Sequence, residues 1–118
     1  MLKAEKKNLN TPDETRTFPK GKFDVVNFSG WSVGKATFEP GWKWSNSVKP
    51  IAKTDSCEAA HAIYVISGRM HVRMNDGVAV EMGPGDAVNV PPGHDAWVIG
   101  SEPCIALDFS AAKTYAVK

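Results

Sequence analysis

The chain has 118 residues, 42% of them apolar and 23% charged, which is the size and composition of one globular domain. Its formal net charge of +1 gives no reason to expect binding to nucleic acid, a membrane surface or another polyanion. Two cysteines, Cys57 and Cys104, are too few for a disulfide scaffold, so we expect them to pack in the core or to bind a metal. Since the sequence has no long apolar run and no secretory leader pattern, we expect a cytoplasmic protein.

Residues 1–20 are polar, carry Pro12 and Pro19 and show no clear period, so we expect an arm or a short edge strand there. Turn signals then follow at short intervals, separated by segments rich in Val, Ile, Phe, Trp and Thr. No segment has a helical period, and many short strands in series predict an all-β sandwich or barrel. The turn signals are Gly30, Pro40-Gly41, Pro50, Gly68, Asn75-Asp76-Gly77, Gly83-Pro84-Gly85-Asp86, Pro91-Pro92-Gly93, Gly100 and Pro103.

Four of these segments have readable strand patterns. Residues 57–66 are apolar on both faces, which predicts a central strand that is covered on two sides or packs on a partner chain. Residues 69–74 and 78–82 alternate in polarity, and the Asp76-Gly77 pair between them suits a tight hairpin. In residues 104–109 we expect the core side chains at positions 105, 107 and 109, so that Cys104 takes no part in a site. The expected core residues of the hairpin are Met70, Val72, Met74, Val78, Val80 and Met82.

The turn residues match two short motifs. Gly85, Pro91 and Gly93, in GDAVNVPPG, fit the pattern G-x5-P-x-G-x2-H-x3-N. Gly41 and Gly68 fit the two ends of the pattern G-x5-H-x-H-x3,4-E-x6-G. These are the motifs of the cupins, and the chain resembles that family over roughly residues 31–110. The resemblance implies an all-β double-stranded β-helix, the RmlC-like jelly-roll barrel.

The chain departs from the family at the positions of the metal ligands. Counted back from Gly68, the glutamate position holds His61, and the two histidine positions hold Asp55 and Cys57. Counted forward from Gly41, the same histidine positions fall eight residues earlier, so we expect an insertion between the two ends of the motif. The ligands of the family therefore cannot be copied onto this chain without change.

Three residues remain as candidate metal ligands: Cys57, His61 and His94. Alternation along a regular strand would put Asp55, Cys57 and His61 on the face that the family turns into the barrel. Ala96 stands at the histidine position of the second motif, and His94 lies two residues earlier with the same parity. Thiolate and imidazole donors suit Zn²⁺ or Fe²⁺ better than Ca²⁺ or Mg²⁺. Alternatively, His61 is a hydrogen-bonded core histidine, Cys57 an inert thiol and His94 a turn residue bonded to backbone carbonyls.

The segment GWKWSNSVKP, residues 41–50, places Trp42 and Trp44 on either side of Lys43. Large rings are costly to leave in water, so they could pack in the core or in a subunit interface. They could instead form a wall over the mouth of the barrel, where Lys43 or Lys49 would reach an anionic substrate. The candidate substrate-binding residues are Trp44, Lys49 and Asp55.

The resemblance also implies an assembly, because cupins of this size commonly pair through their N-terminal strands. We expect a homodimer in which residues 1–30, an arm and a first strand, could cross to the partner subunit. Residues 31–112 would form the barrel and residues 113–118 a C-terminal tail. The expected partners are a small-molecule ligand and a second copy of the chain, with no nucleic acid and no membrane.

Three functions are compatible with these residues. The first is a metal-dependent enzyme acting on a small organic molecule, either a dioxygenase or an isomerase or lyase. The second is a sensor or binding module that holds a small molecule without metal and without turnover. The third is a metal-free enzyme resembling the sugar-nucleotide epimerases of the same superfamily, with a histidine as general base. The third is the weakest, because glutamate and tyrosine are lacking at inward positions.

Overall fold

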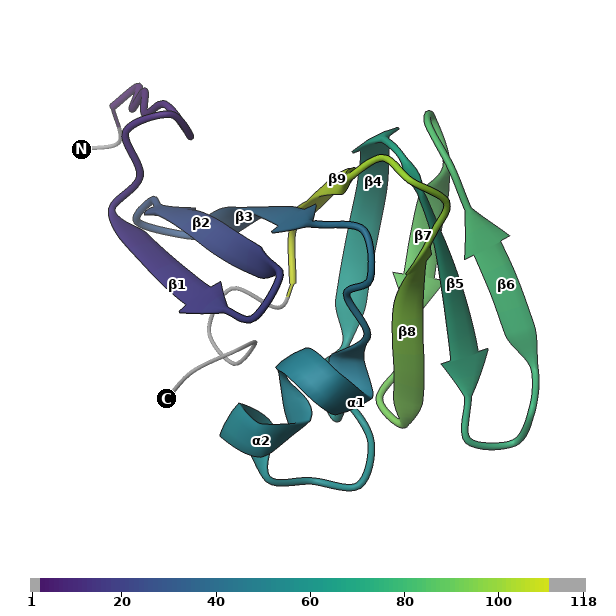
Figure 1. Ribbon diagram of the computed structural model, residues 1–118. Helices are drawn as coiled ribbons and strands as arrows, with labels where there is room; N and C mark the ends of the chain where they lie inside the picture. The colour runs from purple at the N-terminus through teal and green to yellow at the C-terminus, as the bar shows by residue number, and fades with distance from the viewer. Residues whose placement is uncertain (1–2, 111–118) are drawn as a thin grey trace.

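The computed structural model describes residues 3–110, and in this range it has nine strands and two single-turn helices (Figure 1). The strands are β1 (Glu14–Phe18), β2 (Gly21–Asn27), β3 (Ser32–Phe38), β4 (His61–Ser67), β5 (Arg69–Met74), β6 (Ala79–Met82), β7 (Ala87–Val90), β8 (His94–Ile99) and β9 (Cys104–Asp108). The helices are α1 (Trp44–Ser47) and α2 (Lys49–Ala52). No helix in residues 3–110 is long and apolar enough to cross a membrane.

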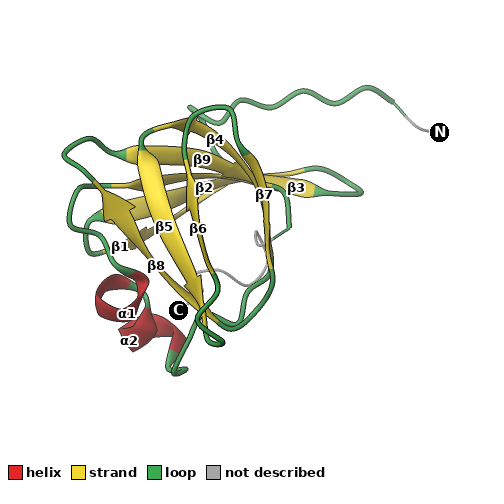
Figure 2. Ribbon diagram, turned by 90° about the vertical axis from the view of Figure 1, so that its right-hand side faces the viewer, coloured by secondary structure: helices red, strands yellow, loops and turns green. Residues whose placement is uncertain are grey.

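The strands form two antiparallel sheets that wrap around one apolar interior. The larger sheet has the order β1-β2-β3-β9-β4-β7 and the smaller one the order β6-β5-β8. Figure 2 shows the sheets curving into a barrel, with α1 and α2 at one end. The prediction of an all-β jelly-roll barrel is therefore confirmed, and the interior between the two sheets is where a site can be built.

The hairpin predicted at residues 69–82 is formed by β5 and β6, but only part of its expected core face is buried. Met70, Val72 and Met82 are buried, whereas Val78 is 62% exposed and Val80 is 46% exposed. The expectation for these two valines was wrong, because β6 is one of the two edge strands of the smaller sheet and Val78 precedes it in the turn. Alternation identifies a face correctly, but burial also requires a neighbour that covers it.

The segment between Gly41 and Gly68, where we expect an insertion relative to the family motif, contains α1 and α2. No helix was predicted there, and each helix has only four residues, too few for a helical period in the sequence. Val48 joins the two helices and is buried, and Lys53 ends the second helix in the left-handed conformation with φ of 60°. The two helices lie at one end of the barrel, where α1 contacts β8 (Figure 2).

The N-terminal strands belong to the barrel of their own chain. β1 pairs with β2 and β2 pairs with β3 in the larger sheet, while Phe18, Phe23 and Val25 are buried in the core. Residues 14–27 therefore extend the larger sheet. The crossing of the arm to a partner and the homodimer remain predictions, and the predicted tail at residues 113–118 lies outside the described residues.

Candidate metal centre

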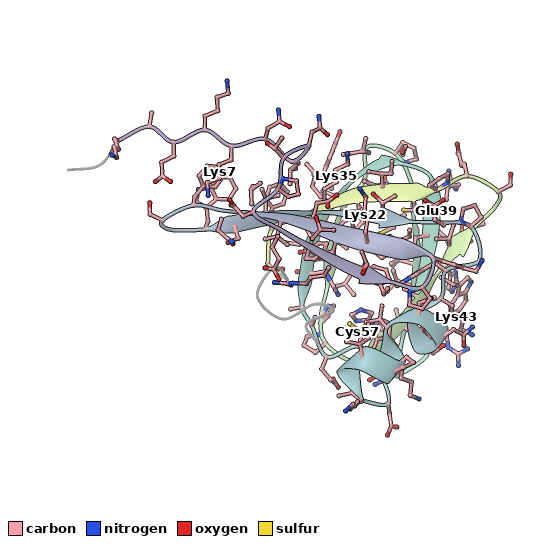
Figure 3. The ribbon with its side chains drawn as sticks, turned by 60° about the vertical axis from the view of Figure 1, so that its left-hand side comes forward. Lys7, Lys22, Lys35, Glu39, Lys43 and Cys57 are labelled. Atoms are coloured by element: carbon pink, nitrogen blue, oxygen red, sulfur yellow. The ribbon has the colours of Figure 1, made fainter. Side chains whose placement is uncertain are left out.

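Cys57, His61 and His94 come together in the interior, at the end of the barrel near the two helices. Their Sγ and ring nitrogen donor atoms all lie within 4.8 Å of one another, and all three side chains are buried. Figure 3 labels Cys57 next to the helical segment and beneath the large sheet. Residues that are separated by up to 37 positions in the sequence therefore form one compact donor cluster.

Backbone hydrogen bonds between the loop that carries Cys57 and the start of β8 position the cluster. Cys57 lies outside the regular strands and forms an isolated bridge with His94, the first residue of β8. The Cys57 amide donates to the His94 carbonyl over 2.7 Å, and the Gly93 amide donates to the Cys57 carbonyl over 2.7 Å. His61 is the first residue of β4 and pairs with Val90 of β7. Each donor therefore stands at the point where a strand starts or a bridge forms, at the same end of the barrel.

The ring of His61 is held between a carboxylate and the thiol. Its Nδ1 lies 2.5 Å from Oδ2 of Asp108, and its Nε2 lies 3.6 Å from Sγ of Cys57. Asp108 is the last residue of β9 and is buried, and its other oxygen, Oδ1, accepts from the Ser110 amide. Since Nδ1–H donates to Asp108, Nε2 is the nitrogen that faces the cluster, which is the usual arrangement of a metal-binding histidine.

The ring of His94 is oriented in a similar way, but by the backbone. Its Nδ1 lies 2.9 Å from the carbonyl oxygen of Pro91, which can only accept. The proton therefore sits on Nδ1, and Nε2 carries the lone pair. The rings of His61 and His94 meet edge to face, with centroids 5.1 Å apart. The Pro-Pro-Gly turn before β8 thus sets the tautomer of His94 as Asp108 sets that of His61.

The same contacts shift the pKa values of the thiol and the imidazole. Burial alone would raise the pKa of Cys57, but hydrogen bonds and charges from His61 and His94 outweigh it and lower the pKa from 9.0 to about 7. Burial alone would lower the pKa of His61, but the bonds to Asp108 and Cys57 raise it from 6.5 to about 9. Near neutral pH the metal-free site therefore favours a thiolate beside an imidazolium, and a metal would displace the proton of His61.

The donor set fits a transition metal. A tetrahedral ion with metal–sulfur and metal–nitrogen bonds of about 2.3 and 2.0–2.1 Å separates its S and N ligands by about 3.6 Å. The distance from Cys57 Sγ to His61 Nε2 is 3.6 Å, so these two donors already have the required spacing. One thiolate and two imidazoles suit Zn²⁺ or Fe²⁺, and three protein ligands leave a fourth position open.

A cavity of about 40 Å³ lies in the barrel interior beside the cluster. His61, His94 and Asp108 reach it, and the rest of its wall is apolar side chains from both sheets together with two indoles. A water molecule needs about 10–15 Å³ of such space, so the cavity holds a few waters or a few ligand atoms. The apolar part of the wall includes Phe23, Phe38, Ile63, Met70, Val72 and Val90.

The three predicted substrate-binding residues fall in three different places. Trp44 is buried and lines the cavity. Lys49 is half-buried in the first turn of α2 and does not line the cavity. Asp55 is exposed and borders a surface groove with Lys43 and Asn75, so the expectation that it shares a face with Cys57 and His61 was wrong. Residues 54–56 bend instead of continuing β4, which breaks the alternation on which that expectation depended.

Asp108 is the one residue of the site that the sequence reasoning missed. The side chains of β9 that face the core are Cys104, Ala106 and Asp108, each less than 5% exposed, whereas Phe109 is 48% exposed. The expected parity of this strand was therefore reversed. The larger apolar residues Ile105 and Leu107 alternate with these three and are only half-buried. The sequence did contain one signal: Asp108 is an acid at alternate spacing with Cys104 and Ala106, and so shares a strand face with them.

Comparisons with known proteins agree with this architecture. A family model described as "Cupin domain" matches residues 51–110, half of the chain. No curated protein matches the sequence. A solved structure of unknown function from Rhizobium leguminosarum bv. viciae is 20% identical with a TM-score of 0.64, and the match covers 92% of this chain and 97% of that one.

Two further solved structures carry a fold name. An RmlC-like cupin from Shewanella frigidimarina is 24% identical with a TM-score of 0.57, and the match covers 86% of each chain. A cupin domain from Bordetella pertussis is 14% identical with a TM-score of 0.54, covering 78% of this chain and 93% of that one. At these identities the likeness is one of fold alone.

Proposed function

This chain belongs to the cupin family, and on that premise we propose that it is a metal-dependent enzyme acting on a small organic molecule inside its barrel. The proposed metal is Zn²⁺ or Fe²⁺, and the proposed ligands are Cys57, His61 and His94. The observation that carries the proposal is the position of the buried donor cluster beside a cavity that both histidines reach. A metal with three protein ligands keeps a position through which a substrate atom can bind.

A bound metal would supply Lewis-acid polarisation or, if it is iron, dioxygen chemistry. The chain would supply everything else. The Cys57 thiolate and the two Nε2 atoms would hold the ion, while Asp108 and the Pro91 carbonyl keep the rings oriented. The apolar wall would exclude bulk water and so strengthen the electrostatic interactions at the substrate.

The lack of other acid–base groups supports the role of a metal. Among the described residues that line the cavity, the titratable ones are His61, His94 and Asp108. All three are engaged in the cluster or in orienting it. Among the described residues that line the cavity, no titratable side chain therefore remains for a proton-transfer mechanism that does not involve the cluster.

One observation favours a second function, the metal-free acid–base enzyme. His61 and Asp108 form a buried carboxylate–imidazole pair at the cavity, and such a pair is an established arrangement for a general base. Such an enzyme would also need a general acid on the other side of the substrate. Tyr64, also in β4, does not meet this need, because its side chain is 46% exposed. This function predicts that the protein turns over its substrate with no metal bound. The sensor function differs in predicting binding without turnover.

Metal titration of chelator-treated protein tests the proposal. We expect one Zn²⁺ or Co²⁺ per chain by calorimetry, and a thiolate-to-cobalt charge-transfer band in the Co²⁺ spectrum. Cys57→Ser should abolish the band, whereas Cys104→Ser should keep it, because Cys104 is buried in the wall formed by β9. His61→Ala should weaken binding strongly, and His71→Ala serves as its control on the outer face. Wild-type protein that binds neither ion would overturn the proposal and leave the metal-free functions.

A further inference from the structure

Two buried side chains in the cavity wall have polar atoms that the metal cluster does not use. Trp42 and Trp44 are each 2% exposed, and both line the cavity. Neither Nε1–H has a hydrogen-bond partner among residues 3–110. A buried indole N–H normally finds an acceptor, because leaving it unpaired forfeits its bond to water without replacement.

The backbone explains why both indoles face inward. Lys43, between them, forms a bridge with Trp97 of β8, and its ammonium group lies 5.1 Å from the centroid of the Trp97 ring. Figure 3 shows Lys43 on the outer side of the molecule, away from Cys57. Alternation about Lys43 therefore turns Trp42 and Trp44 together toward the interior. The Trp42 ring is fixed there by Phe38, with centroids 4.3 Å apart.

The chain has two other tryptophans, and neither lines the cavity. Trp31 is 55% exposed and stacks on Phe28, with centroids 4.8 Å apart. Trp97 is half-buried and stacks on His71 at 4.5 Å. The two tryptophans that line the cavity are therefore the two whose buried N–H groups lack a partner among residues 3–110, which the apolar packing alone does not explain.

We propose that Trp42 and Trp44 bind the oxygen of a carboxylate or carbonyl group on a small molecule held in this cavity. An indole N–H is a donor only, so its missing partner must be an acceptor. The cavity of about 40 Å³ admits a head group of a few non-hydrogen atoms, and its apolar wall suits a short hydrocarbon remainder. The inference rests on the proposed function in placing the ligand beside the metal ligands His61 and His94.

Indole N–H resonances provide a direct test. Protein labelled with ¹⁵N at tryptophan should give four indole cross-peaks, one for each of Trp31, Trp42, Trp44 and Trp97. Trp42→Phe and Trp44→Phe, made separately, assign the two cavity peaks. Propanoate and acetone are then titrated into both chelator-treated and Zn²⁺-loaded protein. Xenon, an apolar probe without an acceptor, shows what filling the cavity does by itself.

We expect at least one of propanoate and acetone to move the Trp42 and Trp44 peaks downfield in a saturable way, while the Trp31 peak stays fixed. The probe that binds identifies the carboxylate or the carbonyl as the preferred group. Each Phe variant should weaken that binding about five- to tenfold, the effect of one lost hydrogen bond, and Trp31→Phe should leave it unchanged.

The proposal is overturned if neither probe moves the two cavity peaks, or if xenon moves them downfield as far as the probes do. Zn²⁺ binding, measured on the same samples, distinguishes failure of the indole inference from failure of the metal proposal. Metal binding without a probe response ends the indole inference alone. A probe response in protein that binds no Zn²⁺ or Co²⁺ supports the indole inference and ends the metal proposal.

Discussion

His61 and Asp108, 47 positions apart in the sequence, are joined inside the barrel by a 2.5 Å contact between Nδ1 and Oδ2. The contact links the first residue of β4 to the last residue of β9, across neighbouring strands of the larger sheet. It orients the ring whose other nitrogen faces Cys57. A residue that would not itself touch the metal is therefore expected to control how well the metal binds.

Asp108→Asn should weaken Zn²⁺ binding about 10- to 100-fold, the usual cost of losing such a partner. If the Asn oxygen keeps the bond from the Ser110 amide, its NH₂ group faces His61. Nδ1 must then accept, the proton moves to Nε2, and the metal-binding lone pair is lost. Competition calorimetry with a chelator measures the effect. Equal affinities in variant and wild type would contradict the role assigned to Asp108.

The same substitution should change how the stability of the metal-free protein depends on pH. The pKa of His61 is raised from 6.5 to about 9, so its contribution to stability is present in full below about pH 6.5 and is lost as the pH rises through 9. Asp108→Asn should therefore cost more at pH 6 than at pH 10, with a difference on the order of 2 kcal/mol. Urea unfolding at the two pH values measures it, and a larger loss at pH 10 would refute the sign.

Metal removal should destabilise the wild-type fold. Free Zn²⁺ at 100 times its dissociation constant adds about 2.7 kcal/mol, which for a domain of this size raises the unfolding midpoint by about 10 °C. His94→Ala should lose most of this metal-induced rise, whereas His71→Ala should keep it. The comparison uses the rise with metal rather than the starting midpoint, since His94→Ala also removes the bond to Pro91. An undiminished rise in His94→Ala would exclude this residue as a ligand.

Cys104 should be almost inert to alkylation in the folded protein. It is completely buried, and burial raises its pKa from 9.0 to about 11. At pH 8 about one molecule in a thousand would carry the thiolate, and the native rate should rise about tenfold per pH unit up to the pKa. Iodoacetamide labelling of Cys57→Ser, followed by mass spectrometry with and without urea, tests this. Fast native labelling at pH 8 would show that the strand β9 opens readily.

Gly68→Ala should be far more damaging than Gly77→Ala, although both glycines have positive φ. Gly68 has φ of 76°, and a Cβ atom there would lie 2.1 Å from the Pro103 carbonyl oxygen. Gly77 has φ of 93° with open space around it, so its variant should lose only about 1 kcal/mol, the cost of a left-handed alanine. We expect Gly68→Ala to lose about 3 kcal/mol or more in urea unfolding. Similar losses in the two variants would show that the contact with Pro103 relaxes at little cost.

The barrel could be predicted from the chain because its turns depend on local backbone geometry. Gly85, Gly93 and Gly68 adopt positive φ, a conformation that glycine reaches more easily than other residues, and their spacing survives in the sequence. The helical turns α1 and α2 could not be predicted in the same way. Four residues are too few for a period, and their helical form depends on packing against the end of the barrel.

The sequence by itself determined the order of the turns, the barrel that they imply and the three donors Cys57, His61 and His94 as candidates. Only the tertiary structure decided which groups these donors meet: Asp108 on His61, the Pro91 carbonyl on His94, and a cavity with two unpaired indoles beside them. It also placed Asp55 beside a surface groove, because a bend interrupts the alternation that had predicted an inward side chain. The physical reason is that turn preferences act within a few residues, whereas side-chain partners and burial depend on strands that pair across the whole chain.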